Sequence, residues 1–155
     1  MPFTIRRIMP ADDEQMDAYL DMFGEAFDDV HTYSAKRPSP EYQRKLLASD
    51  YFIAIAAFKD DEIVGGIAAY ELKKFEQERS EIYIYDLAVD ASCRREGIAT
   101  AMIEELKKIG AERGAYVIFV QADTGVEDEP AIALYTKMGV REDVLHFDIE
   151  VPVRR

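Results

Sequence analysis

The sequence predicts one α+β domain over residues 1–155, a mixed α/β fold with the element order β-α-α-β-β-β-α-β-α-β. One observation behind this prediction is an apolar run at residues 82–89, followed by an amphipathic helix that opens at Gly97 and a second apolar run at residues 116–122. A strand, a helix and a second buried strand form a βαβ unit, so the two strands are expected to be parallel. A second observation is a pair of apolar runs joined by the acidic turn 59–62, which predicts a β-hairpin.

The N-terminal half starts with a short β-rich segment and continues with apolar residues at helical spacing. Pro10 ends the first strand, and Asp12 or Asp13 can cap the helix that follows. The next stretch, DDVHTYSAKRPSP, has loop composition, and its last proline suits the first position of a second helix. The predicted elements of this half are strand Phe3–Ile8, a helix from about 12 to 29, a helix from Pro40 to Ala48, and hairpin strands Tyr51–Phe58 and Ile63–Leu72.

The C-terminal half continues from the predicted βαβ unit. Gly114 is expected to end the helix that opens at Gly97. An acidic loop, Asp123–Glu129, precedes a helix that starts at Pro130 and is closed by Gly139. Apolar and polar residues alternate over Val144–Val151, which predicts a last strand.

Composition narrows the functional classes. The apolar fraction of 48% and the charged fraction of 32% are typical of soluble globular proteins, and the chain lacks an apolar run of membrane-spanning length and a signal-peptide core. Cys93 is the only cysteine, and the two histidines lack ligand-like spacing. We therefore expect a cytoplasmic protein without disulfide, metal or membrane partner. The net charge of −12 disfavours nucleic-acid binding and is compatible with a cationic partner.

The turn between the predicted strand and helix has the layout of a phosphate-binding loop. It reads Arg94-x-x-Gly97-x-Ala99, and it opens a helix whose first N–H groups and positive dipole end can face an anion. The chain contains neither a GxxxxGK[ST] loop nor a GxGxxG fingerprint, so nucleotide-binding motifs of those classes are absent. An ordinary strand-to-helix turn with solvated arginines is the alternative interpretation.

This turn resembles the acyl-CoA pyrophosphate loop of the GNAT acetyltransferases. A second segment, Asp128, Ala131, Tyr135 and Gly139, has the spacing of another motif of that family. The resemblance implies a central, mostly antiparallel sheet whose parallel strands 4 and 5 splay apart around acetyl-CoA, with Tyr135 near the sulfur. A core aromatic is the alternative for Tyr135. The implied cofactor-binding residues are Leu87, Ala88, Val89, Arg94, Arg95, Gly97, Ile98, Ala99, Thr100 and Tyr135.

Longer segments resemble a narrower group, the type I aminoglycoside 3-N-acetyltransferases. This resemblance implies transfer of an acetyl group from acetyl-CoA to the 3-amino group of a 2-deoxystreptamine aminoglycoside, by direct attack in a ternary complex, and a homodimer. The loop after Asp123 is longer than is usual in the group, which bears on the range of drugs. The matching segments are Phe27–Ser34, Lys73 to Ile103, Gly114 to Asp123, Ala133 to Glu142 and His146 to Glu150.

Asp86 is the main candidate for a catalytic base because it is the only charged residue in its apolar run. Burying a carboxylate costs several kcal/mol unless a partner offsets that cost. It can accept structural hydrogen bonds, or it can attract a cationic amine and take its proton. The resemblance aligns it with a carboxylate beside the acetyl site. Glu81, at the start of the strand, is the reserve base.

The candidates for binding the acceptor are Asp29, Tyr33, Asp86 and Asp123, followed by Glu127 and Asp128. A polycation needs a cleft lined with carboxylates, but each of these acids can also be a solvated loop residue. Two other functions stay open. The chain can be a GNAT enzyme for another cationic amine, such as a polyamine, a small metabolite or a protein amine, or a silent acyl-CoA-binding module.

Overall fold

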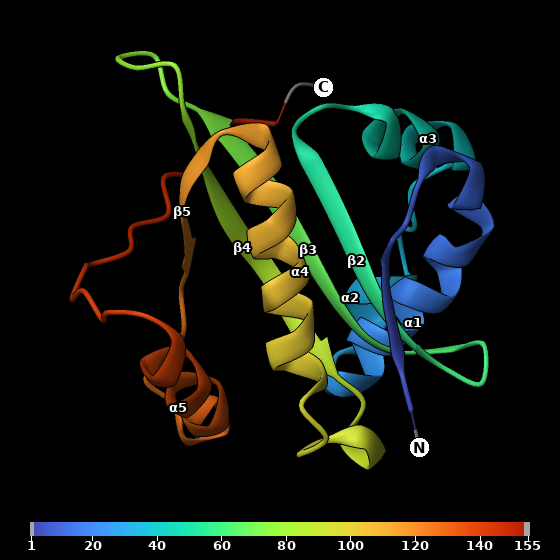
Figure 1. The fold of residues 1–155 in the computed structure, drawn as a ribbon. Coiled ribbons are helices and arrows are strands. Elements are labelled where there is room, and N and C mark those ends of the chain that lie inside the picture. The colour runs from blue at the N-terminus through green and yellow to red at the C-terminus, as the bar shows by residue number, and fades with distance from the viewer. Residues whose placement is uncertain (1, 154–155) are drawn as a thin grey trace. The chain divides into compact units, whose positions relative to one another are not determined.

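The computed structural model describes residues 2–153, which form two compact units, residues 2–121 and 122–153. The first unit is built on a five-stranded sheet with the order β1-β2-β3-β4-β5. Neighbouring strands are antiparallel from β1 to β4, whereas β4 and β5 are parallel, as the predicted βαβ unit requires (Figure 1). The strands are β1 (Thr4–Arg7), β2 (Phe52–Lys59), β3 (Glu62–Lys73), β4 (Ser80–Val89) and β5 (Ala115–Val120).

Helices cover both faces of this sheet. A Cβ built on Gly65 would meet Ile98 and Met102 of α4, whereas one on Gly66 would meet Tyr19 of α1 at 2.8 Å. Successive strand residues point to opposite faces, so α1 and α4 pack on opposite sides of β3. The helices of this unit are α1 (Met16–Ala26), preceded by the 3₁₀ segment η1 (Pro10–Gln15), α2 (Val30–Ser34), α3 (Pro40–Ala48) and α4 (Ile98–Arg113), preceded by η2 (Ala91–Cys93).

The sheet splays open between β4 and β5. The two strands pair only from Ser80 to Ile84 on β4, although β4 continues to Val89. The second half of β4 is paired with β3 alone, where Leu87 lies opposite Ile67 and Val89 lies opposite Gly65. This geometry agrees with the splayed parallel strands that the sequence motifs imply.

The segment predicted as a loop before Pro40 contains a short helix, α2. Its sequence includes the β-branched Val30 and Thr32, which lower helix propensity. For this reason the sequence pattern did not predict the helix. Tertiary packing stabilises it, because Tyr33 stacks on Phe23 of α1 at a ring-centroid distance of 6.1 Å. Propensity in so short a segment was overridden by this contact.

The second unit consists of η3 (Val126–Asp128), helix α5 (Glu129–Met138) and an irregular segment after Gly139. The strand predicted at Val144–Val151 is not formed in the described structure. A strand needs hydrogen bonds from a neighbouring strand, and none is paired with this segment within residues 2–153. Its apolar side chains are instead exposed, among them Phe147 and Ile149. Across the residues described, every helix is too short or too polar to cross a membrane.

Candidate active site

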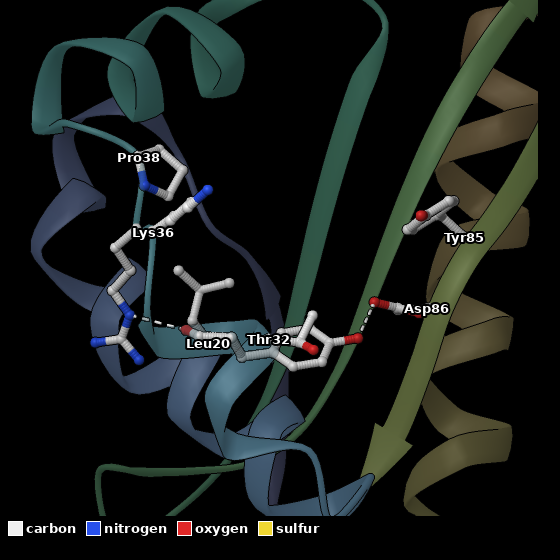
Figure 2. A pocket seen from close by; sticks show the side chains of 8 residues that line it. Leu20, Thr32, Lys36, Pro38, Tyr85 and Asp86 are labelled. Carbon is white, nitrogen blue, oxygen red and sulfur yellow. Dashed lines mark hydrogen bonds between the residues drawn. The ribbon is translucent and has the colours of Figure 1, made fainter. Parts of the chain in front are cut away.

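A β-bulge in β4 creates the centre of the site. Ala69 of β3 pairs with Ile84 and Ala68 pairs with Asp86, so Tyr85 is an extra residue on β4. Bulges locally re-aim side chains and are enriched next to active sites. The bulge places Tyr85 and Asp86 together at the wall of one pocket (Figure 2).

The pocket lies between the bulge and the segment from α1 to α3, within the first unit. Its volume is about 190 Å³. Tyr33 of α2 also lines it, and the Tyr33 hydroxyl donates a hydrogen bond to Asp86 Oδ2 at 2.8 Å. The lining residues are Leu20, Thr32, Tyr33, Lys36, Arg37, Pro38, Tyr85 and Asp86.

The electrostatics of Asp86 suit a group that exchanges a proton. Burial raises the pKa of its carboxyl above the ordinary 3.8, and the hydrogen bond from Tyr33 opposes that rise. The pKa of Tyr33 is itself raised, first by burial and then by its hydrogen bond to Asp86. The proton of this pair therefore stays on the phenol, and Asp86 is the acceptor.

Aromatic rings continue from the pocket along the sheet. Tyr85 makes edge-to-face contacts with Tyr70 on β3 and with Tyr83, and Tyr83 stacks on Phe119 of β5 at 4.8 Å. Tyr85 is 61% exposed, so its ring is available to a ligand. No motif in the sequence pointed to Tyr85, Lys36 or Arg37 as site residues. The alternation of Tyr83 and Tyr85 was visible, but neither the bulge nor the position of α2 could be read from the pattern.

Glu81, the reserve base, does not share this pocket. It precedes Asp86 by five residues on β4, or about 16 Å along an extended strand. Its carboxylate accepts hydrogen bonds from Tyr116 and Lys74. The Tyr116 hydrogen bond lowers the pKa of Glu81, with Lys74 adding to the effect. These contacts lower the basicity of Glu81, whereas burial raises that of Asp86.

The turn before α4 has the backbone of an anion-binding loop. Arg95 and Gly97 have φ values of 67° and 83°, and a Cβ on Gly97 would find open space. The first helical hydrogen bond joins Ala101 N–H to the Gly97 carbonyl, so the N–H groups of residues 98–100 precede the helical ladder and can serve a ligand. Arg94 and Arg95 are exposed beside them.

An ion pair and a hydrogen bond to neighbouring strands fix the position of this loop. Lys59 of β2 makes an ion pair with Glu96 at 2.6 Å, and Arg94 Nε donates to the Val89 carbonyl at 3.3 Å. The main chain of residues 87–89, which β5 leaves unpaired, leads from Asp86 towards the loop. The strand edge that β5 leaves unpaired can hydrogen-bond an extended ligand, and the arginine-containing loop after it can bind an anion. Together they fit an extended ligand with a phosphate group, such as an acyl-CoA.

The remaining predicted residues do not line this pocket, and Asp123 and Tyr135 belong to the second unit. Asp29 is exposed at the start of α2. Asp123 is an exposed loop residue whose N–H donates to Asp128 Oδ2 at 3.1 Å. Tyr135 is half-buried on α5, and its pKa is raised by burial and then by Asp128. Within residues 2–153, histidine, cysteine and acidic side chains form no cluster suited to a metal ion.

Comparison with known proteins gives a family and close structural relatives. The model of the acetyltransferase (GNAT) family matches residues 14–140. The crystal structure of an aminoglycoside acetyltransferase from an uncultured soil metagenomic sample is 65% identical, covers 98% of this chain and 100% of its own, and has a TM-score of 0.96. A second enzyme of that description from an uncultured soil metagenomic sample, in complex with sisomicin, is 29% identical over 97% of each chain, with a TM-score of 0.87.

A human protein, N-acetyltransferase 8, is 24% identical over 122 residues, and the match covers 71% of this chain and 53% of the relative. The chain thus spans about half the length of that curated relative.

Proposed function

The chain belongs to the GNAT family of acetyltransferases, and we propose that it acetylates the 3-amino group of 2-deoxystreptamine aminoglycosides. The observation that carries the proposal is Asp86, a half-buried carboxylate in a pocket where the unpaired edge of β4 begins. The aminoglycoside acetyltransferase that is 65% identical over nearly the whole chain supports this class of acceptor. The resemblance of the motifs supports the 3-amino position.

Acetyl-CoA supplies the acetyl group as a thioester. The N–H groups at the start of α4, with Arg94 and Arg95, would hold its pyrophosphate, and the main chain of residues 87–89 would hold its pantetheine arm. A main-chain N–H at Leu87 would stabilise the negative charge that develops on the carbonyl oxygen. This task needs no side chain, which suits a strand edge.

Asp86 would take the proton of the attacking amine. The new C–N bond forms from the nitrogen lone pair, and the C–S bond breaks with its electron pair moving to sulfur. The Tyr33 hydrogen bond is made to Oδ2, so Oδ1 would be the oxygen that accepts the proton of the amine. The Tyr135 hydroxyl would return a proton to the departing thiolate, a role that rests on the motif Asp128, Ala131, Tyr135 and Gly139.

A polycation can bind in this pocket only if the charges of its positive side chains are neutralised or directed into solvent, because they would otherwise repel the ligand. Arg37 is paired with Asp17 at 3.5 Å and with Asp21, so its charge is largely balanced. Lys36 is exposed and can turn towards solvent. Asp29 and Asp123 remain our candidates for contacts with further ammonium groups.

Thiol release from acetyl-CoA tests this function. We expect release with gentamicin or sisomicin and no release above the amine-free control with spermidine. Release with spermidine and with no 2-deoxystreptamine drug would replace the proposal by a GNAT enzyme for another cationic amine. Binding of acetyl-CoA in a calorimetric titration, with no thiol release on any amine, would make the chain a silent acyl-CoA-binding module.

A further inference from the structure

The hydroxyl of Tyr33 is already engaged in the protein. It donates to Asp86 Oδ2 at 2.8 Å, and the proton that it carries is therefore not available to an acceptor molecule. We infer that Tyr33 is a positioning residue that holds the Asp86 carboxylate for catalysis, not a residue that chiefly binds the acceptor. This inference rests on the proposed role of Asp86 as base.

The ring of Tyr33 is fixed on several sides. It stacks on Phe23 with an interplanar angle of 18° and lies 6.0 Å from Phe27. Its main-chain carbonyl accepts a hydrogen bond from Arg37 Nε at 3.1 Å. A side chain held in one rotamer by packing and by its own backbone can hold a second side chain with little further loss of entropy.

The same hydrogen bond favours the ionised form of Asp86. Burial favours the neutral carboxyl, whereas a donor to the carboxylate favours the charged form that a base requires. Tyr19, the buried tyrosine of α1, cannot replace Tyr33, because its hydroxyl donates to the Ile67 carbonyl. The titratable groups around Asp86 are Tyr19 from α1, Tyr33, Lys36 and Arg37 from α2 and the segment after it, Tyr70 from β3, and Tyr83 and Tyr85 from β4.

Tyr33→Phe is the direct test because it removes the hydroxyl and keeps the ring. Because a hydrogen bond to a charged group is lost, kcat is expected to fall about 10- to 100-fold. The acid limb of the kcat/KM profile should move to higher pH, while KM for the drug should stay within about two-fold of the parent value, because no acceptor contact is lost. Tyr42→Phe is the matched control: it removes an exposed tyrosine hydroxyl on α3 outside the pocket, and its pH profile should match that of the parent.

A second measurement needs no substrate. NMR titration of the Asp86 carboxyl in the free protein should give a higher pKa in Tyr33→Phe than in the parent, with circular dichroism confirming that both are folded. A raised KM with an unshifted pH profile and an unshifted Asp86 titration would overturn the inference and return Tyr33 to acceptor binding. Failure of the proposed function would instead appear as absent turnover in the parent protein, whatever the titration shows.

Discussion

Asp86 combines a structural cost with a chemical use. Its carboxyl is half-buried at a bulge, and burial raises its pKa while Tyr33 alone among the pocket residues donates to it. The sequence showed Asp86 as a lone charge in an apolar run, and this was enough to mark it as a candidate. Its partner could not be predicted, because Tyr33 lies 53 residues away and the contact depends on how α2 packs.

The variant Asp86→Asn separates the effect of the buried charge on stability from its role in catalysis. A raised folded-state pKa means that folding favours the protonated form, so the ionised carboxylate lowers stability at pH 7 and this effect disappears as pH falls below the ordinary value of 3.8. We expect the asparagine variant to melt at or above the temperature of the parent at pH 7, with the difference in melting temperature vanishing in acid.

The turnover of Asp86→Asn should fall by roughly two to four orders of magnitude if Asp86 is the base. Near-normal turnover in a folded variant would remove Asp86 from the mechanism.

At the scale of elements, the sequence pattern succeeded where burial and backbone chemistry agree. The helix predicted from Pro40 to Ala48 forms with those bounds, and Gly114 ends α4 as predicted, with φ of 82°. The pattern failed at α2, which tertiary packing stabilises, and at Val144–Val151, where alternation alone supplies no neighbouring strand. Local periodicity predicts which side chains favour burial, but it does not predict which element packs against them.

Gly97 and Gly114 form a natural pair for testing the anion loop. Both have φ near 83°, and a Cβ on either would meet nothing within 4 Å. Alanine at either position should therefore destabilise the fold by a similar amount, about 1–2 kcal/mol. Only Gly97→Ala is expected to weaken acetyl-CoA binding in a calorimetric titration, because Gly97 shapes the turn that would hold the pyrophosphate. Equal binding by both variants would place the cofactor elsewhere.

At the scale of the whole molecule, charge connects composition to the proposed acceptor. The net charge of −12 gives the protein a field that attracts cations over several ångströms. The sequence alone sufficed for this property, since it depends on composition and not on packing. The division into two units and the pairing of Tyr33 with Asp86 depend on tertiary packing and could not be predicted from composition. The homodimer and the single domain over residues 1–155 stay predictions.

Salt should weaken the capture of a polycationic drug. Raising the ionic strength from ~0.1 M to ~1 M shortens the screening length from about 10 Å to about 3 Å. We expect KM for gentamicin to rise at least ~3-fold over this range with kcat little changed, because the field acts on encounter and binding. Free 2-deoxystreptamine, which carries fewer ammonium groups, should show a smaller rise. A KM for gentamicin that does not respond to salt would show that the field does not contribute.

The most direct measurement for the central claim is NMR identification of the product formed from acetyl-CoA and gentamicin. The proposed chemistry predicts a single acetyl group, bonded to the nitrogen at position 3 of the 2-deoxystreptamine ring, in amounts equal to the thiol released. Acetylation at any other amine of the drug would contradict the proposed position. The absence of any acetylated drug would contradict the proposed function.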